Sequence, residues 1–164
     1  MYRRLLMSVF VAFSTACSAP NIPDTLSPIE KEVFVVLVDQ LGELQQPRDG
    51  APLLLCTAYT IAGETQTRSG DALLSALRQA LPPDLKAKII DGTSCSQNRY
   101  GESIAPDGKR ALRFGASRRF EERWHGLIWE AGWMCGALCG SGEIYRIELD
   151  RNQPTAVSVG YWTS

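Results

Sequence analysis

The chain has 164 residues, of which 45% are hydrophobic and 21% charged, and its formal net charge is −1. This length is typical of one domain, and the composition is that of a chain with a buried core, which excludes wholesale disorder. A charge balance this close to neutral gives no indication of nucleic-acid binding, which would show as a strong basic excess.

The first residues have the three parts of a secretory signal. A short basic segment, residues 1–4, precedes an apolar run from Leu5 to Ala16, and small residues follow. The run is about a dozen residues long, whereas a membrane span needs ~20. We therefore predict that residues 1–16 are a signal peptide. Its removal takes Arg3 and Arg4 away and leaves 15 basic and 18 acidic residues, a net charge of −3.

The segment Ser14-Thr15-Ala16-Cys17 resembles a bacterial lipobox, in which small residues precede a cysteine that receives lipid. It matches that motif at Thr15, Ala16 and Cys17, and it departs from it at Ser14, where an aliphatic residue is usual. The resemblance implies lipid attachment at Cys17 and a membrane-anchored lipoprotein of the cell envelope, facing the periplasm or the cell exterior. Cleavage without lipid, which would release the protein into the periplasm, is the alternative.

The chain has five cysteines, namely Cys17, Cys56, Cys95, Cys135 and Cys139. An odd number in an exported protein requires an account of the leftover thiol. If Cys17 carries lipid, four cysteines remain, and an oxidising compartment would pair them. Of the three possible pairings we expect Cys135–Cys139, because the two are close in sequence, and Cys56–Cys95 by elimination. One unpaired buried cysteine is the alternative.

Residues 17–28 contain three prolines among polar residues, which predicts a tether before a single globular domain over 29–164. Ser27, Pro28 and Glu30 have the spacing of a capping box with proline at the first helical position. Apolar residues then recur at helical spacing as far as Leu44. The run Val33–Val38 is rich enough in β-branched residues to form a strand instead, but the start signal favours the helix.

The middle of the chain predicts a strand over residues 53–60 and a helix over 71–81. Ser69 or Asp71 could cap this helix, and Pro82-Pro83 ends it. Residues 82–110 are rich in turn residues, so we expect long loops there.

The last third alternates apolar and polar residues, which is typical of strands with one face in the core. The four alternating segments are residues 112–117, 127–133, 145–149 and 157–161. Residues 150–154 have the composition of a hairpin connection. The predicted fold class is therefore α+β, with two helices packed on an antiparallel sheet of about four to six strands and cross-linked by disulfides.

Residues 135–142 read Cys-Gly-Ala-Leu-Cys-Gly-Ser-Gly between two predicted strands. With Tyr145 and the terminal Trp162-Thr163-Ser164, this segment resembles a group of uncharacterised bacterial exported proteins. Members of the group share a Cys-Gly-x-x-Cys-Gly-x-Gly turn, a strand with tyrosine and a last strand that ends Trp-x-Ser. The match covers about a third of the chain, and residues 112–118 answer only loosely to a further segment of the group. The resemblance supports the fold and implies no activity.

Four kinds of chemistry are alternatives to structural roles for the cysteine, histidine, serine, glutamate and tryptophan side chains. Cys135 and Cys139 could be redox-active, but three residues separate them and no helix N-terminus follows to lower a thiol pKa. The same pair could bind zinc with His125, yet it is the chain's one histidine, and a closed site needs four ligands. A hydrolase could combine His125 as base with Ser141, and no nucleophile-elbow motif supports it.

Several glutamates could supply paired carboxylates for glycoside cleavage, and four tryptophans could form a carbohydrate-stacking surface. The residues in question are Glu121, Glu122, Glu130, Glu143, Glu148, Trp124, Trp129, Trp133 and Trp162. Strand alternation places most of the glutamates on the solvent side and assigns Trp129 and Trp133 to a core. No phosphate-binding loop or dinucleotide fingerprint is present, so no cofactor or metal is expected. We therefore expect a non-catalytic binding or interaction role, with an envelope thiol oxidoreductase or hydrolase as the alternative.

Overall fold

The computed structural model describes residues 20–47, 50–64, 66–124 and 126–164. The predicted signal peptide, Cys17 and His125 lie outside these residues. The elements in chain order are α1 (Pro28–Glu43), β1 (Leu53–Ile61), α2 (Asp71–Gln79), β2 (Ala87–Asp91), η1 (Gly92–Ser94), β3 (Ser96–Gln97), β4 (Ser103–Ile104), β5 (Arg110–Glu121), η2 (Glu122–Trp124), β6 (Gly126–Gly136), β7 (Cys139–Asp150) and β8 (Gln153–Thr163).

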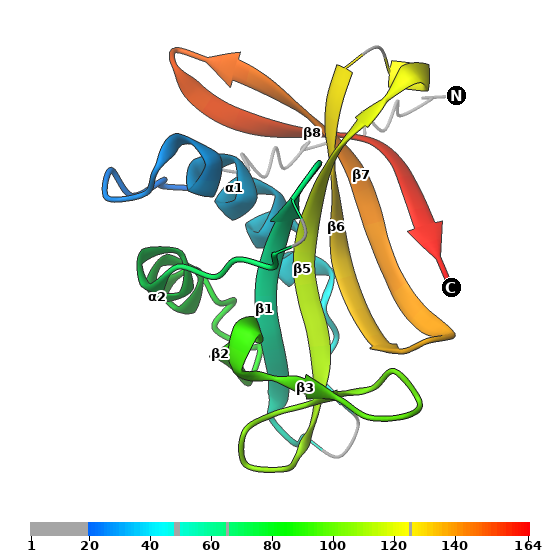
Figure 1. Ribbon diagram of the computed structural model, residues 1–164. Helices are drawn as coiled ribbons and strands as arrows, with labels where there is room; N and C mark the ends of the chain where they lie inside the picture. The colour runs from blue at the N-terminus through cyan, green and yellow to red at the C-terminus, as the bar shows by residue number, and fades with distance from the viewer. Residues whose placement is uncertain (1–19, 48–49, 65, 125) are drawn as a thin grey trace, which may run out of the picture.

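The predicted α+β class is confirmed, with two α-helices packed on one sheet (Figure 1). The sheet has eight strands within the described part of the chain, more than the four to six expected. Six of them follow the order β2-β1-β5-β6-β7-β8, while β3 and β4 extend from β5. The sheet is mixed, because β1 runs parallel to both β2 and β5 while the other pairs are antiparallel. The parallel β1–β2 pair needs a crossover connection, and α2 supplies it.

The predicted long loops over residues 82–110 are wrong in part. This segment contains β2, η1, β3 and β4. Strand β2 has five residues and pairs with β1 from Leu53 to Thr57. Ile89 and Ile90 are adjacent and pack in different apolar clusters, so the sequence of this strand lacks the alternation that would have indicated it.

The capping box before α1 is confirmed. Ser27 Oγ accepts a hydrogen bond from the Glu30 amide at 3.4 Å, and the Ser27 amide donates to Glu30 Oε2 at 3.0 Å. The stretch from Val33 to Leu37 is fully buried and helical. The helix is therefore favoured over the alternative strand by its cap and by burial on more than one side.

Helix α2 ends at Gln79, and neither Ser69 nor Asp71 caps it. Gly70 is the N-cap residue and makes no side-chain bond, while Ser69 Oγ donates to the carbonyl of Thr57 at 3.3 Å. A Cβ on Gly70 would collide with the Glu30 carboxylate. The predicted cap is thus wrong, because the side chain that could have provided it is used to hold β1.

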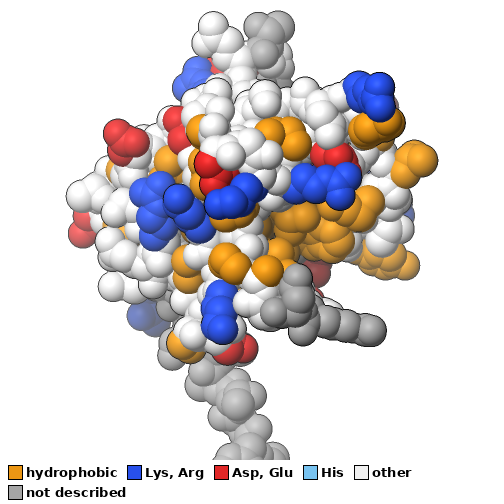
Figure 2. Space-filling view, turned by 90° about the horizontal axis from the view of Figure 1, so that it is seen from below, with side chains coloured by type: hydrophobic (Ala, Val, Ile, Leu, Met, Phe, Trp, Pro, Cys, Tyr) orange, Lys and Arg blue, Asp and Glu red, His pale blue; other side chains and the backbone are white. Residues whose placement is uncertain are grey.

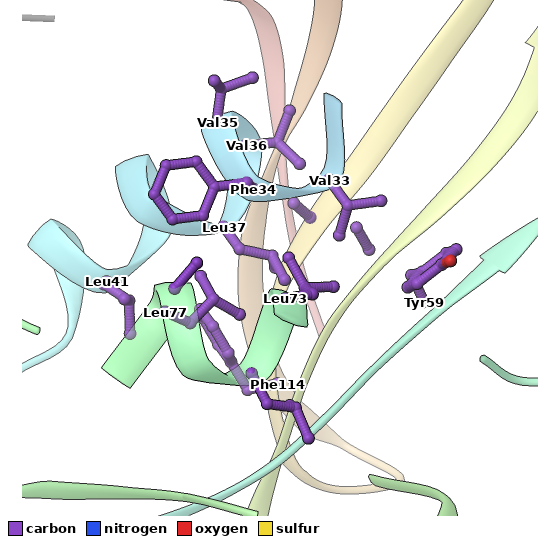
Figure 3. Close-up of a cluster of buried hydrophobic side chains, with 14 of the residues drawn as sticks. Val33, Phe34, Val35, Val36, Leu37, Leu41, Tyr59, Leu73, Leu77 and Phe114 are labelled. Carbon is purple, nitrogen blue, oxygen red and sulfur yellow. The ribbon is translucent and has the colours of Figure 1, made fainter. Parts of the chain in front are cut away.

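Both helices cover the same face of the sheet and bury one apolar cluster against it. Figure 3 shows side chains from the two helices, Leu37 and Leu73 among them, gathered with Phe114 of β5 and Tyr59 of β1. On β6, Trp129 and Ala131 lie in this cluster, as the alternation predicts. Leu127, expected on the same face, is 49% exposed at the end of the strand.

Three hydrogen bonds between side chains attach α1 to the sheet. Trp129 Nε1 donates to Glu32 Oε2 at 2.9 Å, and Gln40 Nε2 donates to the hydroxyl of Tyr145 at 2.7 Å. The Tyr145 hydroxyl in turn donates to Asp39 Oδ2 at 2.5 Å. Burial, and then the hydrogen bond to Asp39, raise the pKa of Tyr145, so its phenol stays neutral.

The segment before α1 contributes to the core, since Leu26 is buried and Ile22 packs against the same cluster. The part of the predicted tether that the structure describes is therefore packed on the domain at these two positions.

Near the C-terminal end of the chain, Arg151 and Asn152 have φ of 49° and 65° and connect β7 to β8 in a two-residue turn. This confirms the predicted hairpin. None of the helices in the described ranges is long and apolar enough to cross a membrane.

Candidate functional site

The face of the sheet that the helices leave uncovered is partly occupied by the segment after β2. Cys56 of β1 forms a disulfide with Cys95, with the Cα atoms 6.2 Å apart. Cys56, Ala105 and Ala111 form a second small apolar cluster. The segment after β2 covers β1 as far as Cys56, and a groove begins at the next residue on this face, Ala58.

A row of small residues crosses the sheet at this point. Ala58 of β1 lies opposite Gly115 of β5, Gly115 opposite Gly132 of β6, and Gly132 opposite Gly142 of β7. Trp162 of β8 ends the row beside Gly142. Since side chains alternate between the faces of a strand, all five positions belong to the uncovered face.

The close approach of neighbouring backbones explains why glycine is found at three adjacent positions. A Cβ on Gly115 would collide with the carbonyl oxygen of Ala58, one on Gly132 with that of Ser141, and one on Gly142 with that of Ala131. Residues with side chains cannot occupy these positions without moving the neighbouring strand. The row consequently forms a floor of bare backbone.

Side chains two residues away on the same strands form the walls. Arg113 and Met134 face each other on one side, and Thr60, Ser117 and Glu130 lie on the other. Each wall lies two residues from the glycine row, so the two walls are four residues apart along a strand, about 13 Å at ~3.3 Å per residue. The whole groove has a volume of about 450 Å³.

Trp162 closes the β8 end of the groove. Its atoms Cε2 and Cζ2 would lie only 2.8 Å from a Cβ on Gly142, so the indole rests on the glycine backbone. Its Nε1 atom is buried and has no hydrogen-bond acceptor within the described part of the chain. An unpaired buried donor is unfavourable and is uncommon in folded proteins.

The two charged residues of the groove differ in their partners. Glu130 forms an ion pair with Arg119 at 3.4 Å. Arg113 has no carboxylate partner among the described residues, and its one polar contact there is Nη2 to the Met134 sulfur at 2.7 Å. The groove therefore presents an unneutralised cation, and the Trp162 ring that borders it has a buried, unpaired N–H.

A second cavity, of about 510 Å³, lies at the end of the sheet where β6 turns into β7. Figure 2 looks at this end of the molecule and shows Lys and Arg side chains in a band beside a hydrophobic area. Within this cavity, Arg110 pairs with Glu102, and hydrogen bonds from Arg110 and Asn98 hold the pKa of Glu102 below its usual value. The Arg110 cation is thus already neutralised by Glu102, whereas Arg113 has no carboxylate partner among the described residues.

The Cys135–Cys139 disulfide borders this second cavity. The Cα atoms are 5.4 Å apart, and the pair flanks the turn between β6 and β7. Both predicted disulfides are therefore present. One joins β1 to the residue after η1, and the other flanks the β6–β7 turn. Cys139 is exposed, while no helix follows the pair that could lower a thiol pKa.

The residues weighed for hydrolysis do not gather at one site. Ser141 and Glu143 line a third cavity, on the helix side between α1 and the first residues of β7, while Glu130 lies in the groove on the opposite face. The structure does not describe His125, so the combination with Ser141 stays a prediction. Among the described residues no three His, Cys, Asp or Glu side chains come together as metal ligands.

Of the groove residues, the sequence indicated only Glu130 and Trp162 as candidates, and for other roles. The glycines at 115, 132 and 142 carry a signal, since each interrupts an alternating strand. Their significance depends on strand register, because only the pairing of the strands places the three glycines in one row.

No family model matches the chain, and neither a curated protein nor a solved structure does.

Proposed function

We propose that this chain is an exported bacterial envelope protein, anchored to the membrane through Cys17, whose role is to bind a small ligand. The glycine-floored groove is the observation that carries the binding role. Its volume of about 450 Å³ falls within the range of small-molecule sites, about 300–1,000 Å³. Its walls combine apolar surface with a few polar groups, which is the usual composition of such a site.

Export is supported by two independent features. The first sixteen residues have the basic start and short apolar run of a signal peptide. The four cysteines that follow Cys17 form two disulfides, which are typical of oxidising compartments such as the periplasm. Lipid on Cys17 would account for the fifth cysteine.

A binding role is favoured over catalysis by the state of the polar groups in the groove. Its one carboxylate, Glu130, is held by Arg119, and Thr60 Oγ1 donates to Ser117 Oγ at 3.0 Å. These contacts orient the walls and leave the Arg113 guanidinium and the ring of Trp162 beside the space for a ligand. Recognition needs no more than such fixed donors around an apolar surface.

The intact mass of the mature protein, isolated from membranes of the producing bacterium, tests the first half of the proposal. We expect a chain that begins at Cys17, carries lipid and contains four oxidised cysteines. A Cys17→Ser variant should leave the membrane fraction. A mature N-terminus without lipid would remove the anchor from the proposal and leave export in place.

Ligand-observed NMR with a fragment set of anionic, neutral and cationic compounds tests the second half. We expect some fragments to bind wild-type protein and to lose binding to Thr60→Trp, which fills the groove. Thr155→Trp, on an exposed position of β8 away from the groove, is the matched control. Fragments that bind both variants equally would place the binding site elsewhere.

One observation favours a second candidate, an envelope thiol oxidoreductase. The Cys135–Cys139 pair borders a cavity and Cys139 is exposed, so a substrate thiol could reach its sulfur. Against this, the position between two strands offers no helix N-terminus to stabilise a thiolate. The alkylation experiment described in the Discussion separates the two functions.

A further inference from the structure

We infer that the ligand of the groove carries a carboxylate on a flat, apolar body. This inference rests on the proposed binding function and adds the chemical class of the ligand. Three features of the groove support it, namely the unneutralised charge of Arg113, the unpaired indole N–H of Trp162 and the bare backbone between them.

The charge of Arg113 favours an anion. Elsewhere in the described chain, Arg68, Arg110, Arg118, Arg119 and Arg146 each lie within 4.0 Å of a carboxylate oxygen. Arg113 contacts only the Met134 sulfur, which is a weak acceptor. Its planar guanidinium matches the two oxygens of a carboxylate, and such pairs form strong, directional hydrogen bonds.

Trp162 supplies a second donor that needs an acceptor. Cε2, which bonds directly to Nε1, lies over Gly142, so the polar edge of the ring borders the floor. Nε1 has no acceptor among the described residues. Indole nitrogen can only donate, and because Nε1 is covered in the free protein, a ligand acceptor would reach it only when the ring turns toward the groove on binding. Both unsatisfied groups of the groove are therefore donors.

The floor selects a flat ligand. Gly115, Gly132 and Gly142 have no side chains, and the walls stand about 13 Å apart along the strands, at ~3.3 Å per residue. A planar ring can lie in this space, against backbone below and the Met134 and Trp162 side chains beside it. A branched group would touch this flat backbone floor at fewer atoms.

The remaining charges are compatible with an anion. Glu130, the one carboxylate of the groove, is paired with Arg119, which also lies 3.6 Å from Glu121. Glu130 belongs to the wall opposite Arg113, so the glycine row separates the two side chains. A ligand carboxylate at Arg113 would thus lie on the far side of the floor from this carboxylate.

Benzoate, benzamide, benzylamine and acetate are the probes that test this inference, with ¹⁵N-labelled oxidised protein and NMR titration as the readout. Benzoate has both the flat ring and the carboxylate, whereas each of the others lacks one or reverses the charge. We expect benzoate to shift the Trp162 indole signal and the amides of Gly115, Gly132 and Gly142. Benzamide and acetate should bind at least about ten-fold more weakly, because a charge-assisted pair or the ring contact is lost.

Variants assign the effect to the two donors. Arg113→Gln removes the cation from an exposed side chain and should weaken benzoate binding at least about five-fold. Arg146→Gln, which removes an exposed arginine from β7 outside the groove, should leave benzoate binding unchanged. Trp162→Phe keeps a ring and removes the N–H, so it should also weaken benzoate binding and identify the indole signal.

The outcomes separate this inference from the proposed function. Equal affinity for benzoate and benzamide, or unchanged benzoate binding by Arg113→Gln, would overturn the carboxylate while the groove remained a binding site. Preferential binding of benzylamine at the same amides would do the same. If no probe shifted the groove signals and no fragment distinguished Thr60→Trp from Thr155→Trp, both proposals would fall.

Discussion

Gln40 and Tyr145 are 105 positions apart in sequence, and Gln40 Nε2 donates a 2.7 Å hydrogen bond to the Tyr145 hydroxyl. Both side chains are almost completely buried, one on α1 and the other on β7. The hydroxyl in turn donates a hydrogen bond to Asp39, an exposed residue. This contact fixes how α1 lies on the sheet, because a buried amide that lost its acceptor would have no water to replace it.

Tyr145→Phe should destabilise the protein by about 1–3 kcal/mol, since it leaves the Gln40 amide buried and unsatisfied. Gln40→Met in the same background should recover part of this loss, because both polar partners are then absent. Urea denaturation of the two single variants, the double variant and wild type measures the coupling. Tyr161→Phe, at a position 82% exposed, is the control and should change stability by less than about 0.5 kcal/mol. Additive effects of the two substitutions would show that the hydrogen bond contributes nothing.

The raised pKa of Tyr145 predicts a loss of stability in alkali. An unfolded tyrosine ionises near pH 10, whereas burial and Asp39 keep the folded phenol neutral to higher pH. The stabilisation is therefore complete below pH ~10 and declines above it, at a slope approaching ~1.4 kcal/mol per pH unit. Urea midpoints at pH 9 and pH 11 should fall further in wild type than in Tyr145→Phe. Burial, followed by repulsion from Glu30, also raises the pKa of Tyr59, which leaves some alkaline loss in the variant.

The two disulfides should contribute unequally to stability. Cys56 and Cys95 are separated by 39 positions and Cys135 and Cys139 by 4. The loop-entropy relation gives about 4 kcal/mol for the longer loop and about 2 kcal/mol for the shorter one. Paired Cys→Ala variants compared by thermal or urea unfolding check the order. A larger loss from the 135/139 pair would show that this turn does more than close a short loop.

Alkylation tests whether Cys135 and Cys139 are redox-active. As a structural disulfide, the pair should remain oxidised when the protein is equilibrated near −270 mV, the potential of thioredoxin, and should then resist iodoacetamide. Full reduction under denaturing conditions should make the cysteines of both pairs reactive, which mass spectrometry counts. Rapid and reversible labelling of Cys135 or Cys139 in the native protein at that potential would favour the oxidoreductase.

Most elements were predictable because their signals lie in neighbouring residues. The Ser27 capping box, the alternation of β5 to β8 and the turn at Arg151 and Asn152 depend on contacts within a few positions. Strand β2 was missed because it is short and its adjacent Ile89 and Ile90 pack in different apolar clusters. Its presence depends on β1 as a partner, and no local pattern reports a partner 30 or more positions away along the chain.

By itself, the sequence determined the α+β class and the positions of both helices and of the last four strands. It favoured the Cys135–Cys139 pair by proximity and left Cys56–Cys95 to elimination. Tertiary structure alone decided that β1 lies between β2 and β5, and that Gly115, Gly132 and Gly142 form one row beside Trp162. The physical reason is that periodicity specifies which face of a strand is buried, whereas register depends on packing between distant segments. A shift of one residue in the β5–β6 or the β6–β7 pairing would have broken the floor of the groove, because glycines would then lie opposite residues with side chains.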